Sequence, residues 1–213
     1  MKVLLGVTGS VATVLTPKLV EELQKAGHEV QIVATNSSTY FFSPNRLNVQ
    51  VWQDDDEWPL VKTITGICYE KGQLIPHIEL RKWADVLVVA PLSANTLAKF
   101  ANGLCDNLIT SVFRAWDFEK PVVLAPAMNT QMWMSPFTQT HLGQLKLLRT
   151  MTLGTIRVVN PQEKVLACGD EGIGAMADIS AIVEAVNKLD KTQSKVDQPP
   201  AEKTATSDVS SST

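Results

Sequence analysis

The residues at positions 8–12 have the types and spacing of a phosphate-binding turn. An apolar run from Lys2 to Val7 leads into the turn Thr8-Gly9-Ser10-Val11-Ala12, and a segment with helical periodicity follows. Gly9 permits a tight turn, Ser10 offers a hydroxyl, and a helix N-terminus presents free amides with a partial positive charge. An anionic phosphate fits this combination. An ordinary strand-to-helix turn capped by Ser10 explains the same residues, so the motif alone leaves both interpretations open.

The second apolar run, Glu29 to Ala34, is followed by Thr35-Asn36-Ser37-Ser38 and by no acidic residue that could hold a ribose. The turn at 8–12 also lacks the G-x-G-x-x-G spacing, so a dinucleotide site is the weaker interpretation. The small hydroxyl and amide groups can bond a mononucleotide phosphate or a ribityl chain, or they can form a polar turn. Phe41 or Phe42 can lie against a flat ring, although core packing is the simpler reading of either in isolation.

A third polar cluster follows the apolar run Asp85 to Ala90, in the string Pro91-Leu92-Ser93-Ala94-Asn95-Thr96. Open α/β sheets bind ligands at the carboxyl ends of their strands, where these side chains are expected. Asn95 can both donate and accept hydrogen bonds, as the polar edge of an isoalloxazine requires. Ser93 can also cap the next helix, and the two roles are compatible.

The elements that position these clusters are strands and helices in alternation. Four runs are rich in apolar residues, as strands buried on both faces are: Lys2–Val7, Glu29–Ala34, Asp85–Ala90 and Pro121–Ala127. A helix with Leu15, Leu19, Leu23 and Ala26 on one stripe lies between the first two, and Pro17 either kinks it or marks its first turn. Further helices are expected at 77–84, 94–101, 107–115, within 136–149 and at 179–189. The pattern predicts a single doubly wound α/β domain with a parallel sheet and helices on both faces.

Composition bounds the rest of the chain. Residues 1–190 suit one globular domain, whereas 191–213 lack aromatic residues and are expected to form a disordered tail. The stretch 63–76 shows little periodicity and reads as a loop. A net charge of −3 gives no reason to expect nucleic acid or an anionic membrane as a partner. The opening apolar run is too short for an export signal or a membrane span. Three scattered cysteines without metal-ligand spacing favour a reducing, cytoplasmic location.

Five strings in collinear order resemble one family. They are GVTGSVA (6–12), PHIELRKWADVLVVAP (76–91), PLSANT (91–96), PAMNTQMW (126–133) and LACGDEGIGAMA (166–177). Together they resemble the flavin-containing cysteine decarboxylases over roughly residues 2–189. The resemblance implies a flavodoxin-like (Rossmann-like) fold, bound FMN, a small cysteine-derived substrate, and a homotrimer with active sites between subunits. The departures are the longer stretch at 63–75 and the tail.

The resemblance also carries site residues onto this chain. It implies FMN contacts at Gly9, Ser10, Val11, Thr35, Ser37, Phe41, Ser93, Ala94, Asn95, Thr96 and Ala127. The catalytic histidine of the family matches His77, its substrate-binding asparagine matches Asn129, and its reactive cysteine matches Cys168. Lys164, Ala167 and Met176 lie in the matching substrate flap. No metal is implied.

The implied chemistry explains why such residues are needed. Loss of carbon dioxide from a cysteinyl carboxylate leaves electrons on carbon, and side chains are poor electron sinks, so a cofactor is required. The resemblance implies transient oxidation at the thiol-bearing carbon, loss of carbon dioxide and re-reduction of an ene-thiolate. His77 follows Pro76 at an expected helix start, which favours a neutral base. Cys168 lies in a glycine-bearing loop that can close over substrate, where its thiol would donate a proton.

The remaining cysteines and histidines receive structural roles. Cys68 and Cys105 are expected to be inert core residues, and His28 and His141 lack a setting that suggests chemistry. The aromatic and methionine residues of QMWM (131–134) are expected to pack the fold or a trimer contact.

Three alternatives follow from the family. Oxidative peptidyl-cysteine decarboxylases stop at the ene-thiol and lack the reducing-step cysteine, so Cys168 argues for the full cycle. The string ACGDEGIGAMA disfavours a flavin prenyltransferase. Some fungal relatives are regulatory subunits that inhibit a protein phosphatase, with catalytic residues divided among unlike chains and long acidic tails. Here His77, Asn129 and Cys168 occur in one chain and the tail is short and mixed in charge, which favours a self-sufficient homotrimeric enzyme.

Overall fold

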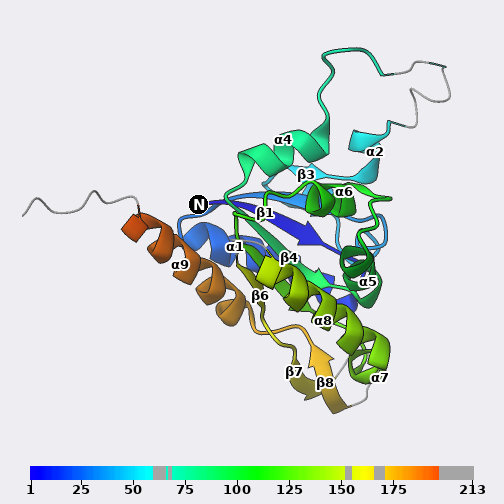
Figure 1. Cartoon of the computed structure of the whole chain (residues 1–213), viewed down its shortest axis with the longest axis vertical. Coiled ribbons are helices and arrows are strands. Elements are labelled where there is room, and N and C mark those ends of the chain that lie inside the picture. The colour runs from blue at the N-terminus through cyan, green and yellow to red at the C-terminus, as the bar shows by residue number, and fades with distance from the viewer. Residues whose placement is uncertain (60–65, 67–68, 152–154, 166–170, 197–213) are drawn as a thin grey trace, which may run out of the picture.

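The computed structural model describes residues 1–59, 66, 69–151, 155–165 and 171–196. Its centre is a parallel sheet of β1 (Lys2–Val7), β2 (Glu29–Ala34), β3 (Val51–Trp52), β4 (Val86–Leu92), β5 (Val122–Pro126) and β6 (Ile156–Val158). The strand order is β3-β2-β1-β4-β5-β6. Figure 1 shows this sheet at the centre of the molecule, with helices on both sides. Without the two-residue edge strand β3, the order is that of flavodoxin-like sheets. The predicted fold class is therefore confirmed.

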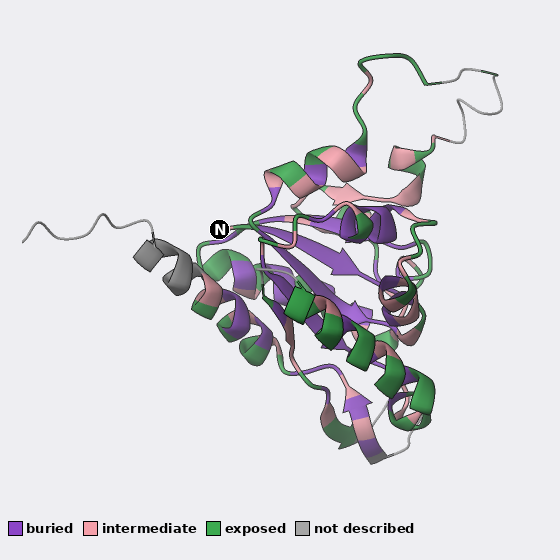
Figure 2. Cartoon of the chain, viewed as in Figure 1, coloured by how far each residue is buried: buried purple, intermediate pink, exposed green. Residues whose placement is uncertain are grey.

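The central strands are buried on both faces because helices cover both. Alternate side chains of a strand point to opposite faces. In β1, Val3 and Leu5 accordingly pack into one hydrophobic cluster, and Leu4 packs into the other. Each such side chain is fully buried, which contributes about 1.5–3 kcal/mol to folding. Figure 2 shows the buried strands enclosed between helices whose outer surfaces are exposed.

Helices cover both faces of the sheet. Helices α1 (Thr16–Lys25) and α9 (Ile179–Val196) supply residues to the first cluster. Helices α4 (Pro76–Trp83), α5 (Ala94–Asn102), α6 (Leu108–Arg114) and α8 (Pro136–Met151) pack on the opposite face. All of these helices were predicted, with boundaries that differ by a few residues except in α9.

The first helix differs from its predicted stripe. Residues Val11–Leu15 form a 3₁₀ turn, η1, and α1 begins only at Thr16, with Pro17 in its first turn. Leu15 is therefore exposed rather than buried, whereas Leu19 and Leu23 are fully buried as predicted. Ala26 is also exposed, since the helix ends before it.

Several short elements were not predicted. Helix α2 (Asp54–Glu57) is a single acidic turn, α7 (Thr130–Met134) follows β5, and η2 (Pro44–Arg46) is one 3₁₀ turn. The strands β7 (Gln162–Val165) and β8 (Glu171–Ala175) form an antiparallel hairpin that lies beyond the main sheet, beside α7 (Figure 1). Polar residues in β7 and glycines in β8 concealed both strands, because neither reads as a strand by propensity.

Two further predictions differ from the structure, one about the end of α9 and one about Cys105. Helix α9 continues to Val196, past the predicted end at Leu189 and past the predicted start of the tail, because Lys and Gln sustain a helix and the first proline comes later. Cys105 is exposed, which corrects its assignment to the core: it lies in the turn after α5, where Gly103 ends the helix. Residues 197–213, Cys68 and residues 63–65 and 67 of the predicted loop before α4 lie outside the described residues.

Among the helices that the structure describes, none is long and apolar enough to cross a membrane.

Candidate functional site

The site lies where two neighbouring strands, β1 and β4, end and their connections diverge. The chain leaves β1 toward α1 on one face of the sheet, and it leaves β4 toward α5 on the other. Such a divergence opens a crevice at the carboxyl edge of a parallel sheet. A cleft of about 1220 Å³ lies at this edge, and its lining includes residues from both connections.

Thr8 joins the two connections beneath the cleft. Its Oγ1 donates to the backbone oxygen of Pro91 at 2.8 Å and accepts from the backbone N–H of Ser93 at 2.7 Å. Its own backbone oxygen accepts from Oγ1 of Thr13 at 2.9 Å. Thr8 and Thr13 are both fully buried, so these bonds are shielded from water. The turn after β1 and the turn after β4 are thus held in one fixed arrangement.

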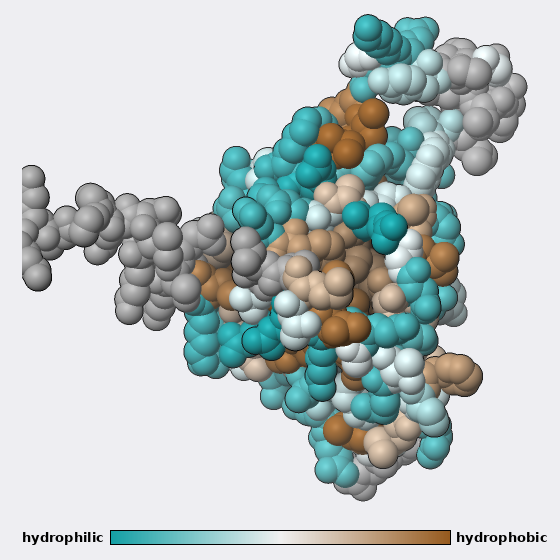
Figure 3. Space-filling view, viewed as in Figure 1, coloured by the Kyte–Doolittle hydropathy of each residue, from teal (hydrophilic) through white to brown (hydrophobic). Residues whose placement is uncertain are grey.

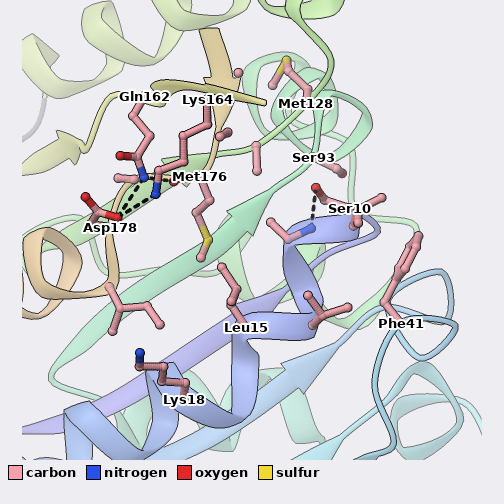
Figure 4. A pocket seen from close by; sticks show the side chains of 18 of the residues that line it. Ser10, Leu15, Lys18, Phe41, Ser93, Met128, Gln162, Lys164, Met176 and Asp178 are labelled. Carbon is pink, nitrogen blue, oxygen red and sulfur yellow. Dashed lines mark hydrogen bonds and ion pairs between the residues drawn. The ribbon is translucent and has the colours of Figure 1, made fainter. Parts of the chain in front are cut away.

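The turn after β1 forms one wall of the cleft. Ser10 is the N-cap of η1, and its Oγ accepts from the backbone N–H of Ala12 at 3.4 Å (Figure 4). A Cβ atom at position 9 would overlap the side chain of Ser37, so only glycine fits there. Gly9, Ser10 and Val11 all line the cleft. The capping interpretation is therefore correct for Ser10, and the same residue still faces the hollow where a phosphate would lie.

The segment after β2 contributes less directly. Thr35 and Ser37 do not line the cleft; their hydroxyl oxygens lie 3.1 Å apart in a mutual hydrogen bond beside Gly9. The two phenylalanines divide between the two roles considered for them. Phe42 is buried in the core, whereas Phe41 lines the cleft.

The turn after β4 forms the opposite wall. Ser93 caps α5, its Oγ accepting from the backbone N–H of Thr96 at 3.2 Å, and Thr96 is buried in this cap rather than in the cleft lining. Ser93, Ala94 and Asn95 line the cleft, and Asn95 is exposed there. Ala127, directly after β5, completes this side.

Asn129 and the β7–β8 hairpin extend the same cleft. Asn129 caps α7, its Oδ1 accepting from the backbone N–H of Gln131 at 2.8 Å, and it lines the hollow. The backbone N–H of Met128 donates to the backbone oxygen of Gly174 in β8 at 3.0 Å. Gly174 has φ of +147°, and a Cβ there would overlap the backbone oxygen of Met128. Glycine at this position therefore allows the hairpin to dock directly on the Asn129 turn.

The polar rim of the hairpin is an ion pair. Lys164 Nζ lies 3.0 Å from Oδ1 of Asp178, which also accepts from Nε2 of Gln162 at 3.1 Å (Figure 4). These hydrogen bonds, first from Gln162 and then from Lys164, lower the pKa of Asp178 below its ordinary value. Met176, on the same side, adds a buried thioether to the lining. The rim thus places a cation beside an apolar wall.

His77 does not line the cleft of its own chain. It lies in the first turn of α4, a helix that packs on the face of the sheet opposite to α1 and α9. Its Nδ1 is 2.6 Å from Oε1 of Glu57, and its backbone N–H donates to Oε2 of the same carboxylate at 2.9 Å. Of the predicted site residues that the structure describes, Thr35, Ser37, Thr96 and His77 do not line the cleft, and the others do. His77 alone lies on a helix away from it.

Comparison with known proteins identifies the family. The model of the family described as Flavoprotein matches residues 1–190. The chain belongs to the Flavoprotein family. A phosphopantothenoylcysteine decarboxylase of Oryza sativa subsp. japonica is 48% identical over 194 residues, which cover 90% of this chain and 82% of that protein.

Two solved structures are similar in both sequence and fold. A mutant PPC decarboxylase complexed with pantothenoylaminoethenethiol superposes with a TM-score of 0.79 at 45% identity, covering 89% of this chain and 98% of that one. The FMN binding protein AtHal3 gives a TM-score of 0.76 at 45% identity, covering 90% and 97%. The family resemblance drawn from the five strings is therefore confirmed.

The cleft also contains residues that the sequence did not reveal. They come from η1, α1, α7 and α9: Val14, Leu15, Lys18, Met132, Val183 and Asn187. Figure 4 shows Leu15 and Lys18 on the opposite side of the hollow from Met176. The sequence did carry a signal for Val14 and Leu15, because apolar side chains directly after a phosphate-binding type of turn are well placed to line a ligand site. The residues of α9 gave no such signal, since they are distant in sequence from every motif. Ala167 and Cys168 lie outside the described residues.

Proposed function

We propose that this chain is an FMN-dependent phosphopantothenoylcysteine decarboxylase, which converts 4'-phospho-N-pantothenoylcysteine to 4'-phosphopantetheine in coenzyme A biosynthesis. The observation that carries the proposal is that one cleft is lined both by residues suited to bind the cofactor and by residues suited to bind the substrate. Its lining includes the turns suited to a flavin mononucleotide together with Asn129, Lys164 and Met176. The similarity to decarboxylases over most of the chain supports the same conclusion.

The residues present fit FMN. The turn around Gly9 is too close to Ser37 for any side chain, and it offers the amides and hydroxyl that a phosphate needs. Asn95 is exposed to the hollow and can meet the polar edge of the ring, while Phe41 and Ala127 supply apolar contacts. When bound, FMN supplies the two-electron acceptor that amino-acid side chains lack. The protein's own groups bind and orient the substrate and move its protons.

Other residues of the cleft lining suit the substrate. We assign the carboxylate or amide of the cysteinyl moiety to the side chain of Asn129, which stands in the lining next to the apolar wall of Met176 and Met132. Lys164 gives the rim a cation that an anionic substrate would approach, although Asp178 already partly neutralises it. Cys168 follows in the same flap, and we assign it the proton that completes the ene-thiolate's reduction.

His77 is assigned as the base that starts the reaction. Because it is absent from the cleft lining of its own chain, we infer that it enters the cleft of a neighbouring copy, and that the functional unit is a homotrimer with active sites between subunits. Exposed hydrophobic side chains on α7 and α8 offer surface for such contacts: Met134 is 62% exposed and Phe137 is 77% exposed. Figure 3 shows hydrophobic groups interrupting an otherwise hydrophilic face.

The test is direct. Purified protein, loaded with FMN, should release carbon dioxide from 4'-phospho-N-pantothenoylcysteine and form 4'-phosphopantetheine, both followed by mass spectrometry. The matched control is the substrate analogue with serine in place of cysteine, which lacks the thiol-bearing carbon and should not react. A folded protein that cannot be reconstituted with FMN, or one that leaves the cysteine substrate intact, would overturn the proposal. The cytoplasmic location stays a prediction, as does the disordered tail, although helix α9 continues to Val196.

A further inference from the structure

Both carboxylate oxygens of Glu57 contact His77. Its Oε1 is 2.6 Å from Nδ1 of the imidazole, and its Oε2 accepts the backbone N–H of His77 at 2.9 Å. The Glu57 side chain is only 7% exposed and that of His77 is 25% exposed. The carboxylate is therefore withdrawn from water, while part of the histidine still faces outward. Carboxylate–imidazole bonds at this length are strong, charge-assisted contacts.

The chain holds Glu57 in place through the short helix α2. At its start, Gln53 and Asp56 form a capping box, with the backbone N–H of Gln53 donating to Oδ2 of Asp56 at 2.7 Å. Asp54 Oδ1 accepts the backbone N–H of Leu108, the first residue of α6, at 2.8 Å. Burial raises the pKa of Asp54, which fits a carboxylate drawn into the fold to make this bond. Glu57 thus lies in α2, a helix that is hydrogen-bonded to α6.

The helix that carries His77 is tied at its other end as well. Lys120 Nζ donates to the backbone oxygens of Arg81 at 3.0 Å and Ala84 at 2.8 Å. These carbonyls lie at the C-terminus of α4, where a cation is favourable. Both ends of α4 are therefore anchored, and the position of the imidazole is set by the fold rather than by a free side chain.

The Glu57 contact also selects the tautomer. An ionised carboxylate only accepts hydrogen bonds, so the proton of the neutral imidazole must lie on Nδ1. Nε2 is then left with a free lone pair, which is the form of histidine that takes up a proton. An acidic partner of this kind commonly fixes both the orientation and the tautomer of a catalytic histidine.

We propose that Glu57 is a positioning residue, which fixes the ring and tautomer of His77 so that Nε2 accepts the proton of the substrate thiol. In that step the S–H bond breaks, its electron pair stays on sulfur as a thiolate, and the proton forms the new N–H bond. The inference rests on the proposed function of His77. A purely structural role, capping the N-terminus of α4, would require only the bond to the backbone N–H.

The experiment compares Glu57→Gln with wild type as FMN-loaded protein. Glutamine keeps the shape and can still cap α4, but its amide can donate to Nδ1 and so permits the wrong tautomer. We expect kcat to fall about 10–100-fold with KM within about 2-fold, FMN retained and the assembly size unchanged. Asp55→Asn is the matched control, because it removes the same charge from an exposed neighbour in α2, and it should change kcat less than about 2-fold.

A spectroscopic measurement separates positioning from folding. The chain has three histidines, so selective ¹⁵N-histidine labelling gives signals from three imidazole rings. The signals that are missing from the spectrum of His77→Asn belong to His77. Wild type should show His77 protonated at Nδ1, and Glu57→Gln should lose that preference. An unchanged kcat in Glu57→Gln, or a wild-type His77 protonated at Nε2, would overturn the proposal. If Glu57→Gln fails to fold, kcat is compared between Glu57→Asp and wild type instead, and the wild-type spectrum still shows whether His77 is protonated at Nδ1.

The failure of the proposed function would look different. Wild-type protein would then lack decarboxylase activity altogether, even if the spectrum showed the Nδ1 proton. A wild type that is active, with a Glu57→Gln variant equally active, refutes only the role of Glu57.

Discussion

Replacing Thr8 with valine should destabilise the fold and loosen the cofactor end of the cleft. Valine matches threonine in shape, so packing is kept while the hydroxyl is removed. The Thr8 Oγ1 is the only acceptor seen for the Ser93 N–H among the described residues, and it also donates to Pro91. A buried donor left without a partner costs about 1–3 kcal/mol, and the lost bond to Pro91 adds about 1 kcal/mol. We therefore expect a loss of about 2–4 kcal/mol in the free energy of unfolding.

Thr8→Ser is the matched control for this prediction. It keeps both hydrogen bonds and removes one buried methyl group, which costs about 1 kcal/mol. Both variants are compared with wild type by denaturant unfolding without FMN, at equal protomer concentration because assembly would add to stability. FMN affinity, measured by quenching of flavin fluorescence, should weaken more in Thr8→Val than in Thr8→Ser. A valine variant as stable as the serine variant would refute the reasoning that Thr8 couples the two turns.

Further variants test the assigned chemistry and one surface ion pair. Cys168→Ser should retain FMN but accumulate an oxidised ene-thiol product by mass spectrometry, and normal turnover would remove its assigned role. His77→Asn should stop carbon dioxide release while the protein stays yellow; undiminished release would mean that another group starts the reaction. The hydrogen bond from Lys99 lowers the pKa of Asp106, so this pair stabilises the folded state above the ordinary aspartate pKa and the stabilisation is lost as pH falls through the lowered value. Asp106→Asn should lower the free energy of unfolding by at most about 0.5 kcal/mol at pH 7, because solvent screens this exposed pair. The difference from wild type should vanish in unfolding curves measured in acid. A difference in stability that does not depend on pH would contradict this prediction.

The sequence predicts the centre of this fold well because burial on two faces leaves a strong signal. Runs such as Lys2–Val7 and Glu29–Ala34 match their strands residue for residue, since nothing but a covered strand explains so short and apolar a run beside turn residues. The capping role of Ser93 was likewise readable, because caps depend on neighbours within a few residues. Local patterns are sufficient for features that are locally determined.

Features that depend on distant contacts were not readable. The strand β8 (Glu171–Ala175) is held by the hydrogen bond that the backbone N–H of Met128 donates to the backbone oxygen of Gly174 rather than by strand propensity, so its sequence looks like a loop. Glu57 lies in an acidic run that resembles a solvated turn, and only the fold shows that its carboxylate is buried against His77. Leu15 looked like the start of a helix stripe because the 3₁₀ turn that rotates it outward leaves the spacing almost unchanged.

The separation of His77 from the cleft of its own chain makes a last prediction about assembly. Asn129 lines that cleft and His77 does not, so a site completed by a neighbour takes these two side chains from different copies. Coexpression of His77→Asn and Asn129→Ala chains, each inactive alone, should then yield mixed assemblies in which some sites hold both intact residues. In a mixed trimer with one or two copies of either variant, one of the three heterologous interfaces pairs an intact cleft with an intact histidine, so about one third of wild-type activity is expected of the isolated mixed species. Purification through two different tags isolates the mixed species, and mixed assemblies of wild-type and His77→Asn chains serve as the positive control. If both residues of each site came from one chain, every site in the doubly mutant mixture would carry a defect, and the absence of recovered activity would refute a site shared between subunits.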